Sequence, residues 1–191
     1  ILYTSFVRKN NTATSPIAMV AQSHIETEKF IQASGIPYTI LKNSLYADVL
    51  PMFLGEKVLE TGVFLNAGNG KASFTARLDM AEAAAVVLTG SGHENKEYII
   101  AGDNNYSLND VAVFLSELTG KSLAYTSPAA DVYTETLIKA GVPATYAGVF
   151  AGFGAAIEQG EFETSSTDLA TLLNRKPTSL KEYLQSVYTK N

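Results

Sequence analysis

A strand–helix–strand pattern in the first 43 residues constrains the fold more than any other feature of this sequence. The opening run Ile1–Val7 is short and apolar, as in a buried strand. A helical pattern begins at Pro16 and ends near Gly35, and a second apolar run, Ile36–Leu41, follows at once. Such short connections indicate a βαβ crossover, so we predict an α/β fold with a parallel sheet covered by helices.

The remaining sequence predicts shorter elements. A D-x-x-E capping box at Asp79–Glu82 indicates the start of one helix, and Ser107–Asp110 indicates the start of another that ends at Gly120. Glycine and proline predict helix breaks at residues 141–143 and 152–154. The other predicted elements are strands at 63–65, 73–77, 98–102 and 123–126, a tight turn at 68–70 and a last amphipathic helix at 180–188.

Composition narrows the classes of function. The chain is 46% hydrophobic and 17% charged, which suits a packed core. No apolar run is long enough to cross a membrane, so we expect no membrane insertion. The absence of Cys fits a reducing compartment, and we expect a cytoplasmic protein. A net charge of -5 with scattered Lys and Arg argues against direct nucleic-acid binding. His24 and His93 lack neighbouring ligands at metal-binding spacing, so no metal site is predicted.

Three stretches in the same order resemble the NmrA-like atypical short-chain dehydrogenases, and among them most closely the bacterial type 2 NAD(P)H:quinone oxidoreductases. They are residues 24–43, residues 68–81, and residues 167–180 with Leu172, Leu173, Arg175 and Pro177. The resemblance implies that residues 1–43 form the C-terminal half of an NAD(P)-binding Rossmann domain. Residues 44–191 would then form mainly a small α+β substrate-binding domain, with residues 79–101 returning to the Rossmann domain.

In that family the pyrophosphate of the cofactor binds a G-x-x-G-x-x-G loop in the first βαβ half of the domain. Ile1 lies inside a predicted strand that would follow that half, so we expect the loop to precede Ile1. Gly62, Gly68 and Gly70 surround a predicted turn and do not replace it. We predict that this chain without the loop binds the cofactor weakly or not at all.

The resemblance also bears on the chemistry. The Tyr-x-x-x-Lys proton relay of standard short-chain dehydrogenases aligns with Val20 and His24, so the relay is absent. Hydride transfer to a quinone depends mainly on holding the quinone ring close to the cofactor, so it does not need the Tyr-x-x-x-Lys relay. His24 is a candidate to stabilise the reduced quinone or to donate a proton; the alternative is a histidine that only forms hydrogen bonds near the start of its helix.

Candidate cofactor residues follow the predicted parallel strands. Asn43, Ser44, Leu45 and Tyr46 come after the second strand, where the family binds the nicotinamide and its ribose; Asn43 and Tyr46 are also catalytic candidates. The alternative is a polar turn with Tyr46 packed in the core. Tyr3, Thr4 and Ser5 end the first strand and would face the same crevice, unless they only cap the strand.

Two further sets of residues are weighed against structural roles. Arg77 suits a cofactor phosphate or substrate, or else a surface ion pair with Asp79 or Glu82. Five phenylalanines are candidates to wall a pocket for a flat ring, although core packing is the commoner role of such residues. They are Phe53, Phe64, Phe74, Phe150 and Phe153.

The resemblance therefore predicts an NAD(P)H-dependent oxidoreductase that transfers hydride to quinones or similar electrophiles, with NADPH as the favoured cofactor. Its expected partners are a small quinone-like substrate and a second copy of the chain in a homodimer. The alternatives are a non-catalytic NmrA-like redox sensor that binds the dinucleotide and a protein partner, and an interaction domain without enzymatic activity.

Overall fold

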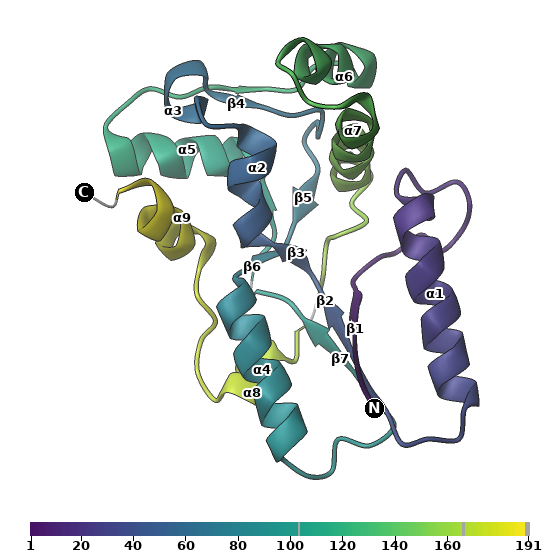
Figure 1. The fold of residues 1–191 in the computed structure, drawn as a ribbon. Coiled ribbons are helices and arrows are strands. Elements are labelled where there is room, and N and C mark those ends of the chain that lie inside the picture. Colours follow the sequence, from purple (N-terminus) through teal and green to yellow (C-terminus); the bar gives the residue numbers. More distant parts are fainter. Residues whose placement is uncertain (103, 166, 190–191) are drawn as a thin grey trace.

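The computed structural model describes residues 1–102, 104–165 and 167–189, and it contains the predicted βαβ unit (Figure 1). Strand β1 (Leu2–Phe6) leads through helix α1 (Ala18–Ala33) to strand β2 (Thr39–Asn43). The two strands are parallel, with Phe6 opposite Asn43, so their carboxyl ends meet at one edge of the sheet. Strand β7 (Lys96–Ile100) pairs with β2, also in parallel, and gives the order β1-β2-β7.

Helices cover both faces of this three-stranded sheet. Helix α1 lies on one face, and α4 (Arg77–Thr89) and α8 (Leu169–Leu173) lie on the other (Figure 1). On the α4 side, apolar residues of the sheet and both helices form one buried cluster: Leu41, Met80, Ala83, Val87, Ile100, Leu169 and Leu173. The fold class predicted from the sequence, an α/β fold with a parallel sheet between helices, is confirmed.

A second hydrophobic core lies beyond the carboxyl ends of the sheet strands (Figure 1). Two-residue strands pair around it: β3 (Leu45–Tyr46) with β6 (Phe74–Thr75) and β4 (Val63–Phe64) with β9 (Tyr125–Thr126) in parallel, and β5 (Lys71–Ala72) with β8 (Tyr106–Ser107) antiparallel. The helices are η1 (Ala47–Val49), α2 (Leu50–Leu54), α3 (Val58–Thr61), α5 (Leu108–Thr119), α6 (Ala130–Lys139), α7 (Ala144–Glu158) and α9 (Leu180–Tyr188). A domain boundary at residue 43 stays a prediction.

The predicted capping box at Asp79–Glu82 is wrong. Helix α4 begins at Arg77, before Asp79, and the Asp79 side chain does not cap it. The Arg77 amide instead donates to the Asp48 carboxylate at 2.9 Å. A carboxylate from a neighbouring segment therefore serves this helix end. Asp79 is buried and accepts hydrogen bonds from the Arg175 guanidinium and the Thr178 amide, each at 2.6 Å. The motif thus joins α4 to the segment that precedes α9.

The predicted helix break at residues 152–154 is also wrong, because α7 continues through both glycines. A Cβ at Gly152 would lie 2.9 Å from the Pro16 carbonyl oxygen, and one at Gly154 would lie 2.9 Å from the Asn66 carbonyl oxygen. These glycines therefore allow close packing inside a helix. The break at 141–143 does separate α6 from α7.

Elements with strong local signals match their predictions. Helix α5 has the capping box between Ser107 and Asp110, and Gly120 ends it in the left-handed conformation at φ 69°. The last helix occupies residues 180–188, as predicted, with Ser179 and Glu182 forming its capping box. Among the described residues, no helix combines the length and apolar character needed to cross a membrane.

Candidate functional site

A cavity of about 410 Å³ lies beyond the carboxyl ends of β1 and β2. Its floor comes from Thr4, Ser5 and Phe6 of β1 and from residues 44–46, which follow β2. Helices α1, α2 and α7 supply the walls. The edge where parallel strands end is where ligands bind in open α/β sheets. The structure thus brings together the two strand ends that the sequence placed at one site.

Aromatic rings form a continuous wall of this cavity. Phe53 of α2 packs against Phe150 and Phe153 of α7, with ring centroids 5.4 and 5.9 Å apart. Phe153 stacks on Phe162 at 5.9 Å, and Phe162 lies 6.4 Å from Phe6. Three of the five proposed phenylalanines therefore line the cavity. Phe64 and Phe74 instead pack in the second core.

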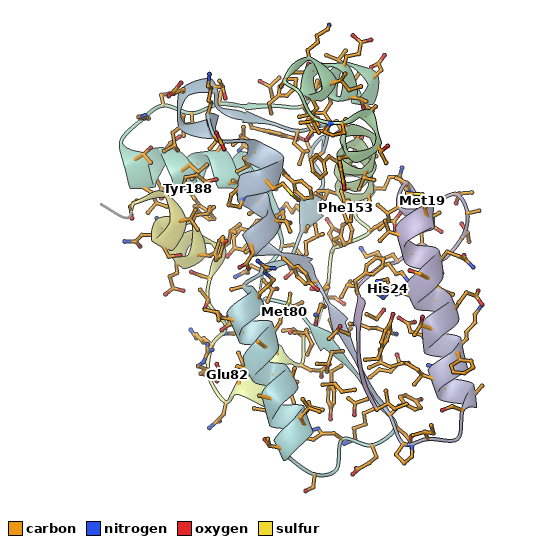
Figure 2. All side chains as sticks on the ribbon, viewed as in Figure 1. Met19, His24, Met80, Glu82, Phe153 and Tyr188 are labelled. Atoms are coloured by element: carbon orange, nitrogen blue, oxygen red, sulfur yellow. The ribbon has the colours of Figure 1, made fainter. Side chains whose placement is uncertain are left out.

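His24 projects from α1 toward the sheet (Figure 2) and lines the cavity. Its Nδ1 lies 2.8 Å from the Tyr3 hydroxyl. The pairing follows from regular geometry. Tyr3 and Ser5 are two residues apart on a strand and point to one face, while His24 and Glu28 are one turn apart on one side of α1. Tyr3 therefore contacts His24. Two residues further along the strand and one turn further along α1, the Ser5 hydroxyl donates to the Glu28 carboxylate.

The surroundings of His24 favour its neutral form. Burial lowers the pKa of the His24 imidazole, and the nearby positive charge of Arg8 lowers it further, although Glu28 opposes this shift. The Phe6 ring meets the imidazole edge to face, with centroids 5.0 Å apart. Within the described residues, only Nδ1 of the imidazole has a hydrogen-bond partner, which leaves Nε2 free for a ligand.

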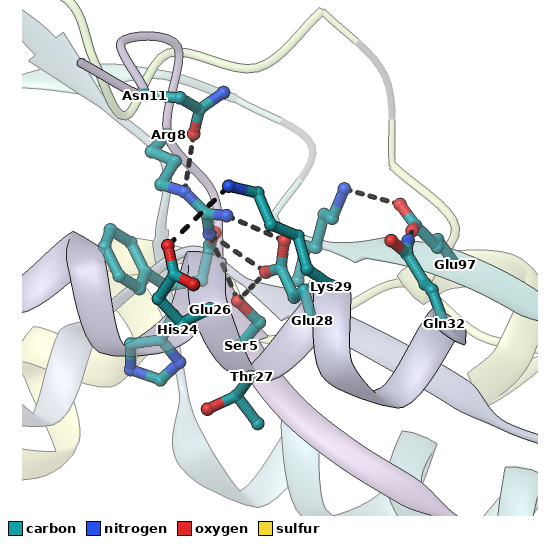
Figure 3. Close-up of polar contacts among 12 residues, drawn as sticks. Ser5, Arg8, Asn11, His24, Glu26, Thr27, Glu28, Lys29, Gln32 and Glu97 are labelled. Carbon is teal, nitrogen blue, oxygen red and sulfur yellow. Dashed lines mark hydrogen bonds and ion pairs between the residues drawn. The ribbon is translucent and has the colours of Figure 1, made fainter. Parts of the chain in front are cut away.

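A buried ion pair anchors the end of β1 to α1 (Figure 3). The guanidinium of Arg8 contacts both carboxylate oxygens of Glu28, at 2.7 and 3.0 Å, and donates to the Phe6 carbonyl oxygen at 3.1 Å. The two side chains are only 6% and 10% exposed. Burial tends to raise the pKa of Glu28, but hydrogen bonds from Arg8 and Ser5 and the charge of Arg8 outweigh it, so the pKa is lowered.

The strand end at β2 combines fixed and unsatisfied polar groups. The Ser44 hydroxyl donates to the Ser73 carbonyl oxygen, and the Ser44 amide donates to the Ile100 carbonyl oxygen at 2.9 Å. These bonds hold the backbone where Ser44, Leu45 and Tyr46 line the cavity. Asn43 is buried, and its Oδ1 has no hydrogen-bond partner in the described part of the chain. A buried acceptor of this kind indicates a missing donor.

Two of the other candidate residues, Tyr3 and Arg77, do not line the cavity. The Tyr3 and Ser5 side chains bond to α1, and Tyr3 does not line the cavity. Arg77 also lies outside the lining; its partner is Asp48, at 3.4 Å, and not Asp79 or Glu82, which both bind Arg175. The cofactor roles assigned to Tyr3 and Arg77 stay predictions.

Sequence reasoning missed Arg8, Glu28 and Phe162. A carboxylate on the buried side of α1, in register with Ala21 and Ile31, was an available signal for Glu28. Phe162 gave no signal, because its place at the cavity depends on the turn after α7. In residues 1–102, 104–165 and 167–189, no group of three or more His, Cys, Asp or Glu side chains has the arrangement of a metal site.

The NmrA-like family model matches residues 1–184 of this sequence. The chain belongs to the NmrA-like family. This confirms the family that the sequence motifs indicated, and the NmrA-like assignment agrees with the parallel sheet and covering helices of the structure.

Individual NmrA-like relatives are longer than this chain. It is 34% identical over 192 residues to quinone oxidoreductase 2 of Escherichia coli (strain K12), a match that covers 100% of this chain and 65% of that protein. The solved NADPH-dependent quinone oxidoreductase from Escherichia coli superposes with a TM-score of 0.89 and 31% identity, covering 98% of this chain and 67% of that one.

A second solved structure, the Citrobacter sp. triphenylmethane reductase complexed with NADP(H), superposes with a TM-score of 0.85 and 31% identity. That match covers 97% of this chain and 64% of the reductase. The chain thus spans about two thirds of the length of the relatives it matches. These likenesses establish a Rossmann-type fold for the described elements.

Proposed function

We propose that the protein is an NADPH-dependent oxidoreductase that transfers hydride to quinones or similar flat electrophiles. The observation that carries the proposal is the cavity itself: an aromatic chamber of about 410 Å³ at the carboxyl ends of two parallel strands. The similar Escherichia coli quinone oxidoreductase and Citrobacter triphenylmethane reductase, described as NADPH-dependent and as complexed with NADP(H), support it.

The strand end fits the ribose or nicotinamide part of a dinucleotide. Asn43 Oδ1 is a buried acceptor without a partner, and both ribose hydroxyls and a carboxamide offer the donor it lacks. Asn43 does not itself line the cavity, but the next residue, Ser44, lies at the floor together with Thr4 and Tyr46. Asn43 and residues 44–46 would therefore hold this part of the cofactor. Bound NADPH would supply the hydride.

The aromatic wall would position the substrate and exclude water. The stacked pair Phe153–Phe162 and the edge-to-face pair Phe53–Phe150 offer both ring faces and ring edges to a flat molecule. Holding the substrate ring close to the hydride donor supplies much of the rate acceleration in a reaction that needs mainly close approach of the two reacting atoms. It also suits a chain that lacks the Tyr-x-x-x-Lys relay.

His24 would stabilise the negative charge that develops on the substrate oxygen. The Tyr3 hydroxyl has no other acceptor among the described residues, so we assign it as the donor to His24 Nδ1. The neutral imidazole then carries its proton on Nε2, the nitrogen left free for a ligand. A positioned N–H donor at a developing oxyanion is an efficient electrostatic stabiliser.

The direct test is NADPH consumption by the full-length protein with a small benzoquinone. The proposal predicts turnover that depends on both the quinone and the cofactor. It fails if calorimetry shows NADPH binding while no quinone is reduced. Much tighter binding of NADP⁺ than of NADPH, with a co-purifying protein partner, would favour the redox-sensor alternative.

A matched pair of variants isolates the role of His24. His93 also bonds a tyrosine hydroxyl through Nδ1, that of Tyr98 at 2.8 Å, but it lines a different cavity at the amino ends of β1 and β2. We expect His24→Ala to lower kcat/KM for the quinone at least about tenfold, the effect of losing roughly 1.4 kcal/mol of transition-state stabilisation. His93→Ala should leave kcat/KM unchanged.

A further inference from the structure

A second cavity, of about 300 Å³, lies next to the candidate site between the start of α1 and α7. The two cavities share Val20, Val149 and Phe153, so they are adjacent and these three side chains lie between them. Figure 2 labels Met19, Phe153 and His24 in this region of the molecule. We call this second cavity the α1–α7 groove.

The lining of the α1–α7 groove specifies an apolar ligand. Among the described residues, no charged side chain lines it, and Thr145 supplies the single hydroxyl group of the lining. Met19 stands at the groove with 77% of its surface exposed, and no polar group of the lining needs a partner. An exposed methionine beside an apolar groove offers a flexible contact for hydrocarbon.

Gly148 of α7 is the position from which the groove can be filled. Glycine in a helix costs about 0.5–1 kcal/mol relative to alanine, so its presence needs a reason. At Gly152 and Gly154 of the same helix the reason is close packing against the backbone of other segments. A Cβ at Gly148 would meet no atom within 4 Å, and Gly148 lines the groove. Among the described residues, no neighbour beyond its own helix would obstruct a side chain at position 148, so a larger residue there would extend into the groove.

We propose that the α1–α7 groove holds the apolar tail of the substrate, so that the protein acts on quinone-like rings that carry a long hydrocarbon chain. The inference rests on the proposed reductase function and specifies its substrate class. The ring would occupy the aromatic chamber, and the tail would leave past Phe153 and Val149 into the groove. Each methylene that the groove removes from water strengthens binding several-fold.

The experiment compares a short benzoquinone with the same ring carrying a decyl chain, using NADPH and the full-length protein. The expected result is a KM at least about tenfold lower for the decyl quinone, with a similar kcat, since the tail contributes binding at a distance from the reacting ring. Gly148→Leu should fill the groove and reduce the ratio of the two kcat/KM values toward one.

Ala170→Leu is the matched control, because Ala170 is an exposed residue of α8 that lines neither cavity. It adds the same kind of apolar side chain and should leave the ratio as in the wild type. The inference is overturned if both quinones have equal KM values, or if Gly148→Leu keeps the ratio. A change in oligomeric state with an unchanged ratio would instead make the groove an interface between copies. If neither quinone is reduced, the reductase function itself fails.

Discussion

At the scale of single residues, the hydrogen bond between Tyr3 and His24 links the strand to the candidate chemistry. Tyr3→Phe removes the donor to Nδ1 and frees the imidazole to change its tautomer and orientation. We expect kcat/KM for a quinone to fall about tenfold and the free energy of unfolding to fall by about 1 kcal/mol. Steady-state kinetics and urea denaturation measure the two effects.

Tyr98→Phe is the control, since it removes the equivalent bond to His93 at the other end of the sheet. It should cost similar stability and leave kcat/KM unchanged. Equal kinetic losses in both variants would mean that Tyr3 acts only through folding.

The lowered pKa of His24 predicts a pH dependence. The unfolded imidazole has a pKa near 6.5, and burial and then Arg8 depress it in the folded protein. The unfolded state therefore takes up the proton first, so the free energy of unfolding should decrease as the pH falls below 6.5 toward the folded pKa. Because a neutral donor suffices, kcat/KM should be flat from pH 6.5 to about 8. A rate that falls as the pH rises through this range would show that the imidazolium is required.

Glu28 is predicted to matter for stability. Glu28→Gln leaves the Arg8 guanidinium buried without its counter-charge and should lower the free energy of unfolding by about 3 kcal/mol. The lowered pKa of Glu28 means that the wild-type contribution is present above pH 4.5 and is lost as the pH falls through the folded pKa.

Glu135→Gln supplies the comparison for Glu28→Gln, because the Glu135–Lys139 pair is 70% and 78% exposed. Exposed pairs contribute little, so this variant should stay within about 0.5 kcal/mol of the wild type. Urea denaturation at neutral pH and at pH 4 measures both variants. Similar losses would contradict the role assigned to the buried pair.

Part of the site could be predicted from the sequence at this scale. The position of Ser44, Leu45 and Tyr46 beside a cavity was predictable, because the end of a parallel strand is visible in the pattern of apolar residues. Their role in cofactor binding, and that of Asn43, stays a prediction. Arg8, Glu28 and Phe162 were not, since their places depend on which segments pack together. The sequence position of a charged residue does not show whether the residue will be buried against a residue of opposite charge.

At the scale of elements, helix α7 contains glycines with opposite predicted responses. Gly148→Ala should raise the free energy of unfolding by about 0.5–1 kcal/mol, because the new Cβ meets no atom and reduces the freedom of the unfolded chain. Gly154→Ala should lower it by about 1–3 kcal/mol, because its Cβ would overlap the backbone and side chain of Asn66. Thermal or urea denaturation gives both signs, and a stabilised Gly154→Ala variant would contradict the packing described for α7.

These glycines also show why some elements were mispredicted. Elements with self-contained signals, such as the capped helices α5 and α9, match the sequence closely. The break expected at 152–154 and the cap expected at Asp79 failed because tertiary partners decide both. Asn66 and Pro16 need glycine inside α7, and Asp48 serves the end of α4 in place of Asp79.

At the scale of the whole molecule, the βαβ pattern predicted the central sheet because the connection between its strands is local. The two-residue strand pairs around the second core were not predictable in the same way. Val63 pairs with Tyr125 and Leu45 with Phe74, and such short pairings between distant residues leave no periodic pattern in the sequence. Residues of these strands share one hydrophobic core with residues of α2 and α7, the helices that supply Phe53, Phe150 and Phe153 to the aromatic chamber.

The central claim is that the carboxyl ends of β1 and β2 form one wall of a nicotinamide crevice. A crystal structure of the full-length protein with NADP⁺ tests it most directly. The account predicts the nicotinamide ribose or carboxamide within hydrogen-bond distance of Asn43 Oδ1, with the ring facing the chamber beside His24. A nicotinamide bound away from both strand ends, with Asn43 Oδ1 still unpartnered, would contradict it.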